Sequence, residues 1–195
     1  ASALTSRLLD ENGRQIADAG IGQILYLEDR QVALTGDTPD TTAVSDIFMT
    51  LGINLSELYF SSTIQLDPDE YRLTNSNSRL KWQPNPSNTL LLNHLAQNQG
   101  TTLETEAISL GGFTRIDNRW ELGAYVNYDL QNDQLFESNL GLRYDSCCWS
   151  AEIVAEHTQL VNGLYNDGIQ FQFELKGIGT PNQRFKRDFS EKLHF

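Results

Sequence analysis

Apolar and polar residues alternate along most of the chain, and this alternation predicts β-strands with one apolar face and one polar face. The clearest example is the stretch 118–130. Its even positions from Trp120 to Leu130 are all apolar, and most of its odd positions are polar. The alternation continues through 134–146 and 166–177, whereas Val154 breaks it within 148–158. No segment keeps the 3.6-residue apolar period of a capped helix.

Turn-forming residues separate these stretches at regular intervals, as in Asn12-Gly13 and Pro84-Asn85-Pro86. This pattern predicts an all-β protein folded as an antiparallel meander. The turns near 11–13, 54–56, 84–86, 116–118 and 145–147 are tight, and longer connections such as 29–43 fall between them. We expect eleven strands, at 2–10, 14–28, 44–52, 57–67, 70–83, 87–97, 102–115, 118–130, 134–146, 148–158 and 166–177.

Alternating strands fit two kinds of protein. In a soluble β-sandwich the apolar face is the core, whereas in an outer-membrane β-barrel it faces lipid and the polar face lines the lumen. The expected strands have about nine to fourteen residues, longer than is typical of soluble sheets and long enough to cross a bilayer. Connections of different length also alternate, as they do in barrels. We therefore favour a barrel, with the tight turns and the C-terminus on the periplasmic side.

Bulky aromatic residues follow the same assignment. Five of them share the apolar parity, and each lies within a few residues of a tight turn: Phe60, Trp82, Trp120, Tyr144 and Trp149. Barrels carry such an aromatic girdle where the wall meets the membrane surface. The alternative is that these side chains fill the core of a soluble, secreted β-sandwich that acts as a binding module.

Composition and strand number limit the function further. The formal net charge of −12 argues against nucleic acid as a partner. No apolar run reaches the roughly 20 residues of a membrane helix. The chain starts at Ala1, within the first expected strand, and single-chain barrels have even strand numbers. Eleven strands should not close alone, so we expect the C-terminal part of a larger barrel.

The two cysteines of the chain, Cys147 and Cys148, are adjacent and lie at a predicted hairpin tip. Neighbouring side chains on extended backbone point to opposite faces, and a bond between them needs strained geometry. One interpretation is that both bond to cysteines outside this chain. The other is that they are half-buried reduced thiols.

Other candidate sites are weak. His94, His157 and His194 show no metal-ligand spacing, so we expect neither a metal nor a cofactor. Glu156 and His157 could serve an outer-membrane barrel enzyme that acts on lipid or peptide, although acids on a polar lumen face more often only contact water. No phosphate-binding loop or nucleophile elbow is present.

Two stretches carry a resemblance to a known family: Leu140 to Trp149, LGLRYDSCCW, and Tyr165 to Gly177, YNDGIQFQFELKG. Both resemble the C-terminal strands of the LptD family of lipopolysaccharide-assembly proteins. Residues 2–27 are similar to a hairpin of that family. The resemblance covers most of the chain loosely and 140–177 closely.

The resemblance implies a transport protein rather than an enzyme. The family forms a large outer-membrane barrel that receives lipopolysaccharide from the LptA periplasmic bridge and releases it into the outer leaflet. A lipoprotein, LptE, plugs the lumen, and the BAM complex assembles the barrel through BamA. By this resemblance Cys147 and Cys148 form disulfides with an N-terminal domain. Residues 1–177 would be the C-terminal strands, and 178–195 a periplasmic tail with basic Arg184, Lys186 and Arg187.

The same resemblance implies a role for the last strand. In the family the first and last strands meet at a seam that opens sideways. The assembly machinery reads a β-signal in the last strand, a polar residue followed by a glycine and two spaced aromatics. That pattern is matched by Asn166, Gly168, Phe171 and Phe173. The alternative is an ordinary edge strand.

Overall fold

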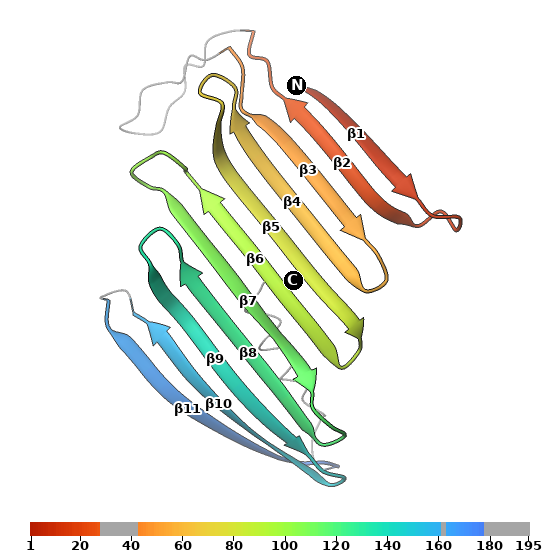
Figure 1. Cartoon of the computed structure of the whole chain (residues 1–195), viewed down its shortest axis with the longest axis vertical. Coiled ribbons are helices and arrows are strands. Elements are labelled where there is room, and N and C mark those ends of the chain that lie inside the picture. The colour runs from red at the N-terminus through yellow and green to blue at the C-terminus, as the bar shows by residue number, and fades with distance from the viewer. Residues whose placement is uncertain (28–42, 161–162, 178–195) are drawn as a thin grey trace.

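The computed structural model describes residues 1–27, 43–160 and 163–177, which form a single sheet of eleven antiparallel strands (Figure 1). Each strand pairs only with its neighbours in sequence, so β1 and β11 are the two edges. The strands are β1 (Ser2–Leu9), β2 (Gln15–Gln23), β3 (Ile47–Asn54), β4 (Leu58–Asp67), β5 (Arg72–Asn85), β6 (Asn88–Gln97), β7 (Thr105–Arg115), β8 (Trp120–Asp129), β9 (Gln134–Asp145), β10 (Trp149–Gln159) and β11 (Tyr165–Leu175).

The eleven-strand antiparallel meander predicted from sequence is confirmed. The main error lies in the second strand, expected at 14–28, because β2 ends at Gln23. Leu25 makes only an isolated bridge to Val44, and residue 28 lies outside the described residues. The third strand, expected to begin at 44, begins at Ile47. The described residues contain no helix long and apolar enough to span a membrane.

The turns divide into two groups at opposite ends of the strands (Figure 1). The connections after β1, β3, β5, β7 and β9 are the tight turns predicted above, and we call their side the tight-turn end. The opposite end carries the connections after β2, β4, β6, β8 and β10. The register of four strand pairs shifts by a bulge or irregularity close to a strand end, which bends and twists a sheet locally.

Burial is the reverse of that in a soluble β-sheet. Polar residues of one face are buried, with Glu121 8% and Asn139 4% exposed. On the other face Leu140 and Phe171 are 57% and 70% exposed. Polar side chains of neighbouring strands contact one another on this face, as expected where a sheet curves around it.

The polar face also contains a small apolar cluster. Tyr125 and Leu91 are almost fully buried there, and Val154 packs against them. Gly123 of β8 pairs with Gly141 of β9, and Gly141 pairs with Val154 of β10, so two residues without side chains lie on one side of Val154 in this row. The exception that Val154 makes in the sequence pattern is therefore a packing contact on the polar face.

Candidate functional site: the last strands and the cysteine turn

The last strand, β11, carries the sequence motif singled out above. Asn166, Gly168, Phe171 and Phe173 all lie within it. Gly168 pairs with Glu156, and Phe171 pairs with Ile153 of β10. Among the described residues no strand pairs with the other edge of β11. Its backbone groups on that side are therefore available to another strand.

The tight-turn end of β11 is held to the β9–β10 turn by Lys176. Its backbone N–H donates to the Cys148 carbonyl at 2.8 Å. Its ammonium forms an ion pair with Asp145 and donates to the Ser146 carbonyl. Because these contacts join the residue after β11 to the turn that carries the cysteines, movement of either segment would disturb the other.

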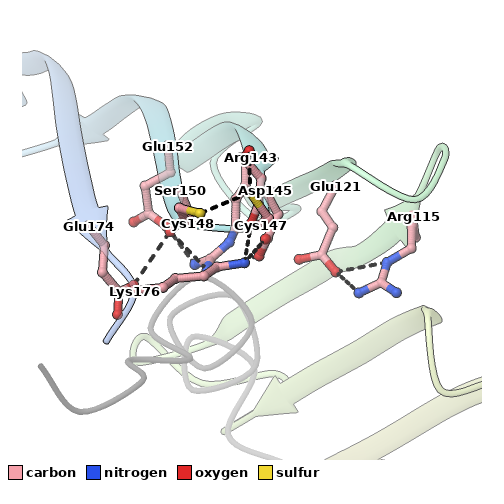
Figure 2. A network of polar contacts seen from close by, with 11 residues as sticks. Arg115, Glu121, Arg143, Asp145, Cys147, Cys148, Ser150, Glu152, Glu174 and Lys176 are labelled. Carbon is pink, nitrogen blue, oxygen red and sulfur yellow. Dashed lines mark hydrogen bonds and ion pairs between the residues drawn. The ribbon is translucent and has the colours of Figure 1, made fainter. Parts of the chain in front are cut away.

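A network of charged side chains covers the polar face beside this turn (Figure 2). Arg143 is its centre, with guanidinium nitrogens 3.4 Å from a Glu152 oxygen and 3.6 Å from an Asp145 oxygen. The same guanidinium donates to the Ser150 hydroxyl, which lies 3.5 Å from a Glu174 carboxylate oxygen. The side chains of Arg143 and Glu152 are only 13% and 10% exposed. The network therefore links β9, β10 and β11 within the curved face.

The network extends along the same row onto two further strands, β8 and β7. Arg115 donates to Glu121 at 2.7 Å, and Glu121 pairs across the strands with Arg143. Successive strands β7 to β10 thus place Arg115, Glu121, Arg143 and Glu152 side by side with alternating charge. Opposite charges on directly paired positions stabilise a sheet.

The two cysteines are free and exposed in the turn between β9 and β10. Their sulfur atoms lie 2.9 Å apart, so the expectation that they point to opposite faces is wrong. Residues 147 and 148 form a bend rather than extended strand. The hydrogen bond from Cys148 lowers the pKa of the Cys147 thiol, with further help from Ser146 and Lys176. The same bond raises the pKa of Cys148. Cys147 is therefore the more readily ionised thiol.

The predicted aromatic residues lie on the apolar face, toward the tight-turn end. Trp120, Tyr144 and Trp149 form a continuous row, with ring centroids 4.8 and 5.1 Å apart. The row ends at Phe173 of β11, which stacks on Trp149 at 5.7 Å. Phe60 and Trp82 lie separately on β4 and β5.

At the opposite end the same face carries polar pairs that the sequence reasoning missed. His157 bonds to Asp167 at 2.5 Å and its ring stacks on Tyr165. His94 bonds similarly to Glu106 at 3.0 Å. His157 and Asp167 are direct partners in the β10–β11 hairpin, so their spacing in the sequence was the signal that could have identified the pair.

Glu156 and His157 do not form the catalytic pair suggested from the sequence, because they lie on opposite faces of the sheet. Glu156 pairs with Gly168 on the polar face and accepts from Gln170, whereas His157 lies on the apolar face. His194 lies outside the described residues. Within 1–27, 43–160 and 163–177, no group of three His, Cys, Asp or Glu side chains could hold a metal ion.

Comparison with known proteins identifies a family. The sequence model described as LptD, LPS transport system D, matches residues 2–108, more than half of the chain. The match covers β1 to β6 and the start of β7. It thus lies wholly outside the stretch 140–177 that carried the closest resemblance.

Individual relatives align over most of the chain. The LPS-assembly protein LptD of Paracidovorax citrulli is 30% identical in an alignment that covers 90% of this chain and 23% of that protein. Its namesakes from Pseudoalteromonas atlantica and Idiomarina loihiensis are 30% and 25% identical and are covered to 24% and 26% of their lengths. The chain therefore spans about a quarter of the length of these curated relatives.

Proposed function

Because the chain belongs to the LptD family of LPS transport proteins, we propose that its strands form part of an outer-membrane barrel wall that inserts lipopolysaccharide into the outer leaflet. The family is one of transport proteins, not enzymes. The observation that carries the proposal is the reversed burial of the sheet, with a curved, charged face and an exposed apolar face. This arrangement suits a wall with lipid outside and water inside.

The proposed wall has a defined orientation. The aromatic row from Trp120 to Phe173, with Phe60 and Trp82, forms the inner girdle, so the tight-turn end and the C-terminus face the periplasm. Residues 1–177 supply strands of the barrel. The tail at 178–195, with Arg184, Lys186 and Arg187, is periplasmic and lies outside the described residues.

The partners follow from the same proposal. The polar face with Arg143 and Glu152 lines the lumen that the LptE lipoprotein plugs, and LptA delivers lipopolysaccharide from the periplasmic side. The free edge of β11 is one side of a seam with the first strand of the complete barrel. Unpaired backbone in lipid costs several kcal/mol per group, so this edge must be paired with that strand or, during assembly, with BamA of the BAM complex. Asn166, Gly168, Phe171 and Phe173 form the β-signal that guides this pairing.

The lipid-facing assignment is tested by an arginine on each face at equal depth. Ile153 lies on the apolar face, and Gln172 lies on the polar face one register position away. Ile153→Arg is expected to cost about 2–4 kcal/mol near the bilayer midplane and to reduce barrel insertion and surface lipopolysaccharide. Heat-modifiable migration of the full-length protein in detergent measures insertion.

Gln172→Arg is the matched control, because its new charge would face the polar side next to Glu152. Normal insertion of this variant beside a defect in Ile153→Arg supports the proposal. Equal defects in both variants would show that the apolar face does not meet lipid.

The cysteine turn gives a second test. In the mature complex Cys147 and Cys148 are expected to be oxidised and bonded to cysteines outside this chain. Their exposure and position at the tight-turn end make them accessible from the periplasmic side of the proposed wall. A bridge that closes a long loop stabilises by roughly 4–5 kcal/mol in the chain-entropy treatment. Full-length protein should therefore migrate differently on gels with and without reductant.

Peptide mapping decides between the remaining possibilities. Free thiols in functional protein, or a bond between Cys147 and Cys148, would contradict the assignment. In reduced protein at mildly alkaline pH, alkylation should modify Cys147 before Cys148, because the lowered pKa leaves more of Cys147 as thiolate.

A further inference from the structure

The apolar face holds a groove over β9, β10 and β11 near the end opposite the tight turns. It is open along the face of the sheet, and its volume is about 490 Å³. Leu140, Ala155 and Ile169 line one part, and Ser138, His157 and Asp167 line the other. Neither the aromatic row nor the cysteine turn is part of this groove.

The apolar half has a small floor between two larger walls. Ala155 pairs with Leu140 on one side and with Ile169 on the other, so its methyl group lies between two long aliphatic side chains. Ile169 is 75% exposed. This half is continuous with the exposed apolar face of the sheet, and its chemistry suits a hydrocarbon chain.

The polar half presents a carboxylate, and an aromatic ring that does not line the groove stacks on its His157. Tyr165 stacks on His157 with ring centroids 4.6 Å apart and planes 16° apart. The Asp167 carboxylate bonds to His157, yet its side chain remains 78% exposed. An aromatic face packs against the C–H groups of a sugar ring, and a carboxylate accepts hydrogen bonds from hydroxyl groups.

The two halves follow one another along the strands. His157 lies two residues beyond Ala155 on β10, and Asp167 lies two residues before Ile169 on β11. The polar half is thus nearer the end opposite the tight turns. In the orientation proposed above, it lies at the outer surface of the membrane and the apolar half lies within the outer leaflet.

We propose that this groove binds a glycolipid, with an acyl chain against Leu140, Ala155 and Ile169 and a sugar at His157 and Asp167, next to the Tyr165 ring. The inference rests on the proposed function, which puts this face in the outer leaflet. An exposed carboxylate disfavours a phospholipid phosphate at this position but accepts from sugar hydroxyls. Because β11 is the seam strand, a glycolipid that leaves the seam would meet this groove on the adjacent wall.

The test uses the full-length protein with its plug, purified in detergent and given purified lipopolysaccharide or phosphatidylglycerol. Native mass spectrometry measures the lipid retained by each barrel. Ala155→Phe fills the floor, and Tyr165→Ala removes the sugar platform. Both variants are expected to retain lipopolysaccharide roughly tenfold less tightly, with phosphatidylglycerol retention unchanged in Tyr165→Ala. Ile153→Phe, on the same face but outside the groove, is the control and should bind as the unaltered protein does.

The outcomes distinguish a failure of the proposed glycolipid site from a failure of the proposed function. If Ala155→Phe and Tyr165→Ala insert normally and retain lipopolysaccharide as well as the control, the groove is wrong and the proposed function stands. A similar loss of both lipids in Tyr165→Ala would overturn the assignment to a glycolipid. If the unaltered barrel retains no lipopolysaccharide, the groove is wrong. Equal insertion defects in Ile153→Arg and Gln172→Arg would instead reject the wall itself.

Discussion

A covalent bond between β11 and the first strand of the complete barrel is expected to stop lipopolysaccharide export and to leave the barrel folded. One edge of β11 is unpaired among the described residues, and in lipid that edge must pair with another strand. A covalent bond across this pairing would keep the seam from opening. A cysteine at Gln172, oxidised to partner cysteines scanned along the first strand, would form the bond. Surface labelling of newly exported lipopolysaccharide measures the effect, which should be close to complete.

A second crosslink provides the control for this experiment. Val154 and Gln170 are direct partners in β10 and β11, so cysteines at these two positions would join strands that are already paired. Export should continue in that variant. Normal export from a barrel whose seam is fully crosslinked would refute the sideways opening of β11.

Arg143→Leu is expected to destabilise the folded barrel by about 3 kcal/mol, at the lower end of the cost of breaking a buried ion pair. The guanidinium lies between Glu152 and Asp145 and is only 13% exposed. Its loss leaves carboxylates of three adjoining strands close together on the curved face. The temperature at which the barrel loses its heat-modifiable form should fall, and guanidinium unfolding in detergent should shift to lower concentration.

Arg14→Leu is the control, because Arg14 also pairs with a carboxylate, that of Asp10, but the two side chains are 58% and 24% exposed. Exposed ion pairs contribute at most about 1 kcal/mol, so this variant should unfold almost as the unaltered protein does. Adding Glu152→Leu to Arg143→Leu should restore part of the lost stability. Equal shifts for the two arginine variants would show that the network around Arg143 contributes no more than a surface contact.

The faces of the sheet could be predicted from sequence because side chains alternate on any strand, whatever surrounds it. Trp120 and Tyr144 therefore fall on the predicted face, and the strand number follows from the turns. The end of β2 could not be predicted, because it is set by its partner. The residues after Gly22 have a composition that favours a strand, but the pair of Gly22 with Phe48 is the last regular one between β2 and β3.

Side-chain packing across several strands could not be predicted from the sequence pattern either. Val154 breaks the alternation, yet its place beside Tyr125 depends on Gly123 and Gly141, which come from two other strands. The cysteine sulfurs lie together because the turn bends, and a bend depends on backbone angles that alternation does not determine. The roles of Cys147 and Cys148, of the β-signal and of the aromatic girdle remain predictions for the experiments above.

The neighbour-only pairing of the strands has a consequence for how the protein folds. No strand needs a partner more than one connection away in sequence, so the sheet has low contact order for a β-protein. Closing each short connection costs little chain entropy, and each new hairpin can add to an edge that already exists. The sheet can therefore grow as a ribbon, one strand at a time. In the proposed barrel, only the final closure, between β11 and a strand outside this chain, requires a search over the whole length of the barrel.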